Sequence, residues 1–467
     1  MSETQASKRL AKGTIIYMIG NLSSKILQML ILPIITVSLI TSEYGYYDLV
    51  VTTISLVTPV ITLQIIEGMF RFMFNASQSE KQRTVSTVTA FLICGVVILA
   101  GIIFLLHWRV PSIRYPFLIY INYVSNILFS YMQKLARCQQ KNRQFAISGV
   151  VNTIVMLGCQ ALTLLIFKMG VDGMLIANAV SYIVASIYLA LYLHIKQWLS
   201  VTYVNKNKFK ELLKYSAPLI PNSICWWFIS SFNSYVITWF LGTAANGVYS
   251  IAGKFSQLLT FVTTVFQLAW QESAIMEENS EERDKFYTRT FNNYMKLLMG
   301  GYLVALPLIK IIIPILLSES YQVGWLYNPI LLIGAVFSAF SQFYGSAYLV
   351  FKKTGGAFYT TVVGAIVNIT IGVGLIQEIG LYAPALGTAC SFLVQWIFRA
   401  YQMREYFKVK VDYKALGILL ILGAMITYVY YVDNAFLQYV AMIVGVAAFF
   451  ILNSEIVKMI LRKITVK

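Results

Sequence analysis

Three ionisable residues, Lys25, Glu67 and Arg71, lie inside apolar sequence near the start of the chain. The stretches that hold them, 15–40 and 49–74, are each long enough to cross a bilayer as a helix, which takes about 20 mostly apolar residues. A charge in the hydrocarbon core costs from about 3 to over 10 kcal/mol, so it is tolerated where it faces water, a partner or a polar cavity. These residues could therefore line a binding cavity inside the membrane.

Both stretches have a polar face. In the first, residues spaced four, four and three apart share one face of a helix: Tyr17, Asn21, Lys25 and Gln28. In the second, Gln64, Glu67 and Arg71 do the same, and Glu67 can also pair with Arg71 one turn later as a purely structural salt bridge. For Lys25 the alternative is that the side chain extends to a headgroup, but its distance from the ends of its segment favours a cavity.

The composition excludes a soluble globular protein. Of the 467 residues, 58% are hydrophobic and 12% are charged, whereas soluble domains have about 25% charged residues. The apolar sequence extends over the whole chain, which predicts an all-α, polytopic membrane protein. The first apolar run is too long for a cleaved signal and should remain as a membrane helix.

Metal and disulfide chemistry are not expected. The cysteines are scattered without motif spacing and are interpreted as small core residues: Cys94, Cys138, Cys159, Cys225 and Cys390. His107 and His194 stand alone, which argues against the common metal sites. We therefore expect no metal, no cofactor and no catalytic residue.

Apolar runs separated by short polar loops predict fourteen transmembrane helices. The predicted ranges are 15–40, 49–74, 85–106, 116–135, 145–167, 173–193, 215–241, 244–271, 286–308, 327–350, 357–376, 383–403, 415–432 and 436–460. They group into two six-helix bundles followed by two additional helices. The predicted domains are 1–200, 201–410 and 411–467.

The loops predict the orientation, because Lys and Arg are retained on the cytoplasmic side. With the N-terminus inside, most of the basic residues fall in cytoplasmic segments, against Arg109, Arg114, Lys168 and Lys310 outside. Both termini are therefore expected in the cytoplasm. This distribution explains the net charge of +17 without a nucleic-acid partner.

A weak internal repeat relates the two bundles. TSEYGYYDLV from Thr41 matches TAANGVYSIA from Thr243, and Asn21 corresponds to Asn222. Because an even number of helices precedes the second copy, the bundles should have parallel topology, with a substrate site between them.

The second bundle carries polar residues for the same seam. Its first helix holds Asn222, Trp226 and Asn233, and its second holds Lys254 and a polar stripe that begins at Gln257. Hydrogen bonding between helices is the alternative explanation of the stripe. Arg399 and Lys296 could be lateral-gate or headgroup contacts, but extension of their side chains to the membrane surface is the preferred expectation.

The chain resembles a known family. The opening KGTIIYMIGNLSSKILQMLILPIIT, the TSEYGYYDL loop and LLKYSAPLIPNSI are similar to the polysaccharide-transporting branch of the multidrug/oligosaccharidyl-lipid/polysaccharide exporter superfamily, and within it to the Wzx-type repeat-unit (O-antigen and capsule) flippases. The resemblance covers nearly the whole chain, and it implies movement of undecaprenyl-diphosphate-linked oligosaccharide across the bacterial plasma (inner) membrane by alternating access.

The resemblance also implies roles for residues. Lys25, Arg71 and Lys254 fit a cationic cavity that binds the diphosphate, because Lys or Arg in a low-dielectric cleft offsets lost hydration. Polar and aromatic side chains would contact the sugars: Asn21, Gln28, Gln64, Glu67, Asn222, Trp226, Asn233 and Gln257. Implied partners are membrane lipids, a polysaccharide polymerase and glycosyltransferases.

Three alternatives stay open. The first alternative is a cation-coupled multidrug antiporter of the same superfamily. The drug-extruding branch usually has an acidic residue in the first helix, however, and 15–40 contains none. Asp48, Glu67 and Glu272 could couple transport to an ion or be structural. The second alternative is an enzyme acting on lipid-linked sugars, which would need a converging acid, base or nucleophile cluster. The third is a scaffold protein, which would not need buried cations.

Overall fold

The computed structural model describes residues 28–73, 76–109, 114–277, 280–351, 354–432 and 434–454. Within these ranges all regular secondary structure is helical. The chain divides into two compact units between Trp227 and Phe228, inside helix α10 (Leu219–Ser230). Each unit is described by itself below.

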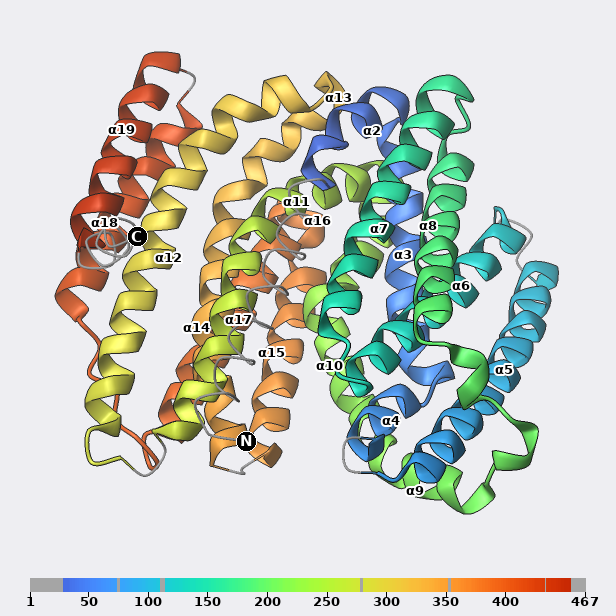
Figure 1. Ribbon diagram of the computed structural model, residues 1–467. Helices are drawn as coiled ribbons and strands as arrows, with labels where there is room; N and C mark the ends of the chain where they lie inside the picture. Colours follow the sequence, from blue (N-terminus) through green and yellow to red (C-terminus); the bar gives the residue numbers. More distant parts are fainter. Residues whose placement is uncertain are drawn as a thin grey trace, which may run out of the picture. The chain divides into compact units, whose positions relative to one another are not determined.

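The first unit contains helices α2 to α9 and the start of α10 (Figure 1). Their bounds are α2 Leu32–Ser38, α3 Thr41–Ile61, α4 Ile65–Met73, α5 Gln78–Arg109, α6 Pro116–Cys138, α7 Asn142–Ala161 with a π-helical extension Leu162–Ile166, α8 Val171–Tyr192 and α9 Lys206–Ser216. Two short 3₁₀ turns, Ile195–Trp198 and Val201–Tyr203, connect α8 to α9.

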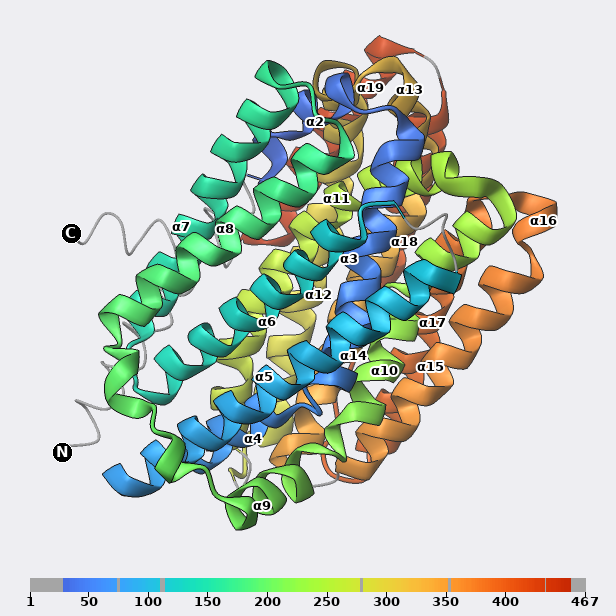
Figure 2. The same ribbon diagram turned by 90° about the vertical axis from the view of Figure 1, so that its right-hand side faces the viewer.

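Helix α8 is central to the packing of the first unit. It lies along α7 and α6 and also contacts α3, as Figure 2 shows for α7 and α8. At the other end, α4 packs against α5, α6 and α9 around a core that includes Met69, Met73, Leu135 and Leu212. Apolar side chains buried between helices in this way fix the positions of the polar groups that the same helices carry.

The second unit contains the remaining helices. Their bounds are α11 Phe232–Met276, α12 Arg283–Leu316, α13 Glu319–Gln322, a 3₁₀ turn Val323–Tyr327, α14 Asn328–Val350, α15 Thr354–Gly374, α16 Ile376–Ile379, α17 Tyr382–Met403, α18 Tyr413–Tyr431 and α19 Ala435–Leu452. Helix α11 is interrupted at Gly242, whose φ of 88° is readily adopted only by glycine.

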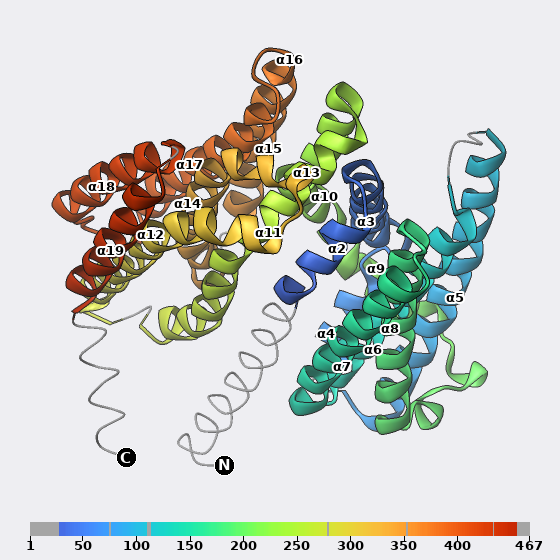
Figure 3. The ribbon, with the colours of Figure 1, turned by 90° about the horizontal axis from the view of Figure 1, so that it is seen from above.

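In the second unit α17 packs between α14 and α15, while α12 packs against α14, α18 and α19; Figure 3 shows α12, α18 and α19 together. Stacked aromatic rings join α11, α12 and α14. The Trp270 and Phe343 centroids are 4.2 Å apart, and Phe291 meets Phe343 edge-on at 5.1 Å.

The chain is a multi-pass membrane protein. Among the described residues eight helices are long and apolar enough to cross a membrane, or up to ten if two bent pairs each form one span. The predicted span 85–106 lies within α5, one of these eight, and the predicted helix 383–403 coincides with α17, which is not one of them. The total of fourteen spans stays a prediction.

Two helices that were predicted to be continuous are broken in the structure. The range 49–74 is broken between α3 and α4, which meet at 59°, and Leu63 and Gln64 in the break have φ of 45° and 54°. The range 215–241 is broken between α10 and α11, with a bend of 44°. Hydropathy reports the composition of a segment and carries no information on its backbone dihedrals, so neither break was predicted.

Candidate functional site

A polar pocket of about 330 Å³ lies within the first unit. Its walls come from α3, α6, α8 and α10, together with Gln64 from the break after α3. The lining residues are mainly amides and hydroxyls: Val51, Ile54, Ser55, Thr58, Pro59, Gln64, Asn122, Asn126, Asn178, Tyr182 and Ser223. No Asp, Glu, Lys, Arg or His stands among these described residues, so the pocket is polar and uncharged.

The break after α3 places Gln64 at the pocket. Pro59 lies inside α3 and has no N–H, so it cannot donate to the Ser55 carbonyl four residues earlier. The chain then leaves the helix through Leu63 and Gln64, both in the left-handed region. The Gln64 Nε2 donates to the Ser223 hydroxyl of α10 at 2.7 Å. A polar side chain is thus bonded to α10 at the point where the helix breaks.

The hydroxyl groups of the pocket are turned toward their own helices. Ser55 donates to the Thr52 carbonyl at 2.7 Å, Thr58 donates to the Ile54 carbonyl at 2.6 Å, and Ser223 donates to the Leu219 carbonyl at 3.1 Å. Each hydroxyl has one proton and two lone pairs. With the proton committed to the backbone, these three groups offer the pocket acceptors.

The amide groups are held in the same way. The Asn122 Nδ2 donates both of its protons, to the Leu118 carbonyl at 2.8 Å and the Leu175 carbonyl at 2.9 Å. The Asn178 Nδ2 donates to the Tyr47 hydroxyl at 2.6 Å. These side chains are only 1% and 6% exposed, so neighbouring helices fix the direction of their amide oxygens.

A cationic cluster occupies the end of α6 next to α4. The Lys134 ammonium lies 2.6 Å from the Glu67 carboxylate and 5.2 Å from the centre of the Phe70 ring. The Arg137 guanidinium lies 4.9 Å from the same ring. Such cation–π contacts retain a positive charge where solvent is reduced. The partner of Glu67 is therefore on another helix, whereas the sequence pattern indicated Arg71.

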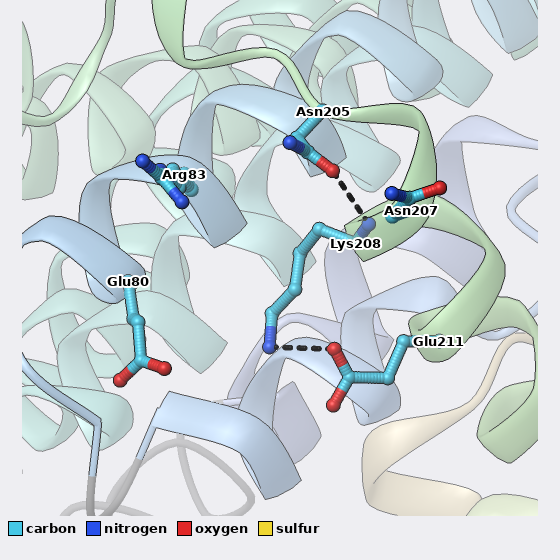
Figure 4. Close-up of a pocket in the computed structure, with 6 residues that line it drawn as sticks. All are labelled: Glu80, Arg83, Asn205, Asn207, Lys208 and Glu211. Atoms are coloured by element: carbon cyan, nitrogen blue, oxygen red, sulfur yellow. Dashed lines mark hydrogen bonds and ion pairs between the residues drawn. The ribbon is translucent and has the colours of Figure 1, made fainter.

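A second pocket, of about 320 Å³, lies between the start of α5 and α9. Figure 4 shows its lining, in which Lys208 Nζ is 3.0 Å from a Glu211 carboxylate oxygen and Asn205 accepts from the Lys208 backbone N–H. Glu80 and Arg83 complete the charged groups. The two cations and two carboxylates balance, so this pocket offers no preference for an anion.

The cations predicted to bind a diphosphate are placed as follows. Lys25, like Asn21, lies outside the described residues. Arg71 is exposed on α4 in the first unit, and Lys254 is half-buried on α11 in the second. The diphosphate site thus stays a prediction.

The other predicted residues differ in exposure. Gln28, Asp48, Asn222 and Trp226 are half-buried, and Gln257 is exposed. The side chain of Glu272 lies outside the described residues. Its role in ion coupling, like that of Asp48 and Glu67, is untested.

Asn233 is buried within the second unit and has protein partners. Its Nδ2 donates to the Thr388 hydroxyl at 2.7 Å and to the Pro384 carbonyl at 3.2 Å, while its Oδ1 accepts from Asn368 at 3.2 Å. These bonds join α11, α15 and α17. In this arrangement Asn233 connects three helices.

The Arg399 side chain is buried, contrary to expectation. It was expected to extend to a headgroup, but it is only 3% exposed and donates to the Thr360 hydroxyl at 3.0 Å, the Ser341 carbonyl at 3.1 Å and the Thr361 hydroxyl at 3.3 Å. A Cβ on Gly345 would lie 2.6 Å from its Nη1, so glycine leaves room for the guanidinium. Lys296 pairs with Asp412 at 3.3 Å.

The pocket residues Asn122, Asn126, Asn178 and Tyr182 were missed from the sequence. A signal was present, because each pair is separated by four residues and so lies on one face of α6 or α8. These side chains are uncharged, so the cost of a buried charge did not single them out. As for metals, the described part of the chain holds no group of three or more His, Cys, Asp or Glu that could bind an ion.

The fold is that of membrane transporters of known structure. The lipid II flippase MurJ in an inward closed conformation matches with a TM-score of 0.71 over 96% of this chain and 100% of that chain, at 14% identity. An inward-facing multidrug resistance MATE family transporter of the MOP superfamily matches with a TM-score of 0.64 over 83% of this chain and 98% of that chain, at 13% identity. At these identities the likeness concerns the fold alone.

Sequence comparison adds a relative and a family. A probable low-salt glycan biosynthesis flippase of Haloferax volcanii, Agl15, is 24% identical over 227 residues, which are 46% of this chain and 47% of that relative. The match thus spans about half of the relative's length. The family model described as polysaccharide biosynthesis protein matches residues 10–271, more than half of the chain. The chain therefore belongs to the polysaccharide biosynthesis protein family, as its resemblance to the polysaccharide-transporting branch predicted.

Proposed function

We propose that the protein is a flippase that moves undecaprenyl-diphosphate-linked oligosaccharide repeat units from the cytoplasmic to the outer face of the bacterial plasma membrane. Family membership and the transporter fold support this assignment. The observation that carries it furthest is the uncharged polar pocket among membrane helices of the first unit. Buried amides and hydroxyls are costly unless they are bonded or serve a polar ligand.

The diphosphate carries the charge of this substrate. In the proposal Lys25, Arg71 and Lys254 line a central cationic cavity and bind it, because a cation in a low-dielectric cleft replaces part of the hydration that the diphosphate loses. The lipid tail stays in the bilayer, so only the head group needs a polar path. Alternating access by the halves 1–200 and 201–410 opens this cavity to one side at a time.

The remaining parts of the proposal concern topology and partners. Fourteen helices place both termini in the cytoplasm, where the substrate is made, and the segment 411–467 adds two helices outside the two bundles. Glycosyltransferases on the cytoplasmic side would supply the substrate, and a polysaccharide polymerase on the outer side would use it. The genes beside this one offer a direct check on that pathway.

The cationic site is tested by neutralising its members one at a time. Lys25→Gln, Arg71→Gln and Lys254→Gln should each abolish surface polysaccharide in the producing cell while the protein stays in the membrane. Lys210→Gln, at an exposed residue of α9, is the matched control and should leave polysaccharide unchanged. Normal polysaccharide in all three variants would remove the cationic cavity from the proposal.

A further inference from the structure

The pocket of the first unit is unusual in the kind of hydrogen-bonding group it presents. Ser55, Thr58 and Ser223 have committed their protons to helix carbonyls. In addition, the Ser55 carbonyl lacks the donor that any residue other than Pro59 would supply. Lone pairs therefore predominate along this wall.

The amides extend the same pattern. Asn122 has used both of its protons on backbone carbonyls, Asn178 has used one on Tyr47, and Gln64 has used one on Ser223. Their side-chain oxygens are left for a ligand, together with one N–H each on Gln64 and Asn178. A ligand that satisfies this pocket must bring donors.

The size and lining of the pocket narrow the class of ligand. A volume of about 330 Å³ lies within the range of small-molecule sites, about 300 to 1,000 Å³, and greatly exceeds the share of one water, about 30 Å³. The lining also includes the aliphatic groups of Val51, Ile54 and Pro59. A sugar ring, with several hydroxyl donors around an apolar C–H face, has both characters.

The lining also discriminates between sugars by charge. A carboxylate accepts hydrogen bonds, whereas the Ser55, Thr58 and Ser223 hydroxyls have committed their protons, and the pocket's described residues include no Lys, Arg or His to pair with it. Burying an unpaired charge is strongly unfavourable. The donors left in the lining are all neutral, namely the Tyr182 hydroxyl and amide N–H groups of Gln64, Asn126 and Asn178, so none of them balances the charge of a carboxylate.

We propose that this pocket is a subsite for one non-acidic sugar residue of the transported saccharide, held through its hydroxyl donors by the side-chain oxygens of Gln64, Asn122 and Asn178. The inference rests on the proposed flippase function and deepens it. It assigns recognition of the sugar to the first unit and separates it from recognition of the diphosphate. The subsite therefore selects by sugar chemistry, whereas the cations do not.

The test uses the full chain reconstituted into liposomes with two probes. One probe is undecaprenyl diphosphate bearing a neutral disaccharide, and the other bears the same disaccharide with one hydroxymethyl group oxidised to a carboxylate. The rate of flipping is measured from access of a membrane-impermeant reagent to the sugar. The wild-type protein should flip the neutral probe at least about tenfold faster than the acidic one, as expected where an unpaired charge must be buried.

Two substitutions on α3 separate the pocket from the rest of the helix. Val51→Trp fills the pocket, and Val60→Trp adds the same bulk outside it. These valines are 39% and 43% exposed, so either side chain can be enlarged without disrupting the packing of the core. Flipping of the neutral probe should fall about tenfold or more in Val51→Trp and stay near wild type in Val60→Trp. Equal rates in the two variants would overturn the subsite.

A second pair protects the test against a misfolded variant. Gln64→Met keeps the length of the side chain and removes its amide, whereas Ser223→Ala removes the Ser223 hydroxyl, and with it the bond from Gln64, but leaves the Gln64 amide in place. Flipping of the neutral probe should fall about tenfold in Gln64→Met and clearly less in Ser223→Ala. Equal losses would assign the effect to that bond and overturn the role of the Gln64 oxygen.

The outcomes distinguish this inference from the proposed function. A wild-type protein that flips both probes equally well, with Val51→Trp also unimpaired, retains the flippase function and overturns the subsite. A wild-type protein that flips neither probe overturns the flippase function itself. A neutral-probe rate that depends on Val51 and Gln64, with a slow acidic probe, supports both.

Discussion

A contact between α12 and α19 gives a prediction whose size can be worked out from the structure. Gly445 of α19 lies so close to α12 that a Cβ there would be 2.5 Å from the Leu303 carbonyl oxygen and 3.0 Å from the Leu303 carbonyl carbon. Both atoms are backbone, so no side-chain rotation relieves the overlap. Gly445→Ala must therefore push α19 away from α12.

The control is a glycine with free space. A Cβ on Gly417 of α18 would meet nothing within 4 Å. Replacing an interior helical glycine by alanine favours the helix by up to about 1 kcal/mol, and overpacking costs about 1 to 3 kcal/mol. The propensity term is common to both variants, so Gly445→Ala should be less stable than Gly417→Ala by about 1 to 3 kcal/mol.

Thermal unfolding of the purified variants in one detergent, followed by tryptophan fluorescence, measures this difference. Gly417→Ala should unfold at or slightly above the wild-type temperature, and Gly445→Ala should unfold at a lower temperature than Gly417→Ala. Identical unfolding temperatures in the two variants would refute the close approach of α19 to Leu303. They would also remove the reason for glycine at that position.

Two further predictions concern charged groups of the second unit. Arg399→Lys should lower the unfolding temperature, because one ammonium cannot reach the three acceptors to which the guanidinium donates. Each lost charged hydrogen bond is worth about 1.5 to 3 kcal/mol. Wild-type stability in this variant would argue against the buried position of Arg399. Asp412 accepts from the Ala415 N–H and pairs with Lys296, which holds the pKa of Asp412 below its ordinary 3.8. Its contribution is present above that value and lost as the pH falls through the lower folded pKa, so the stability gap between wild type and Asp412→Asn should close on acidification; a gap that is constant with pH would contradict this.

Much of the helical framework could be predicted, because an apolar run long enough to cross a bilayer has few alternatives to a helix. The predicted span 383–403 and helix α17 (Tyr382–Met403) agree closely. The break at Leu63 and Gln64 could not be predicted in this way. Neither residue is glycine, and the hydrogen bond from Gln64 to Ser223 that accompanies the break joins residues far apart in sequence.

The candidate site was predicted less well than the fold. Arg399 lies four residues before the end of α17, which made a path to the headgroups plausible. Its actual partners, on α14 and α15, come from tertiary packing that the local sequence does not reveal. The pocket amides were visible as pairs at helical spacing, but only the structure shows that Asn122 and Asn178 have used protons on neighbouring groups.

The most direct test of the central claim is the rate at which the purified protein flips a lipid-linked saccharide. Liposomes with the wild-type protein should expose undecaprenyl-diphosphate-linked disaccharide on both faces far faster than protein-free liposomes, and Lys254→Gln should return the rate toward that background. A wild-type rate equal to that of protein-free liposomes would contradict the account.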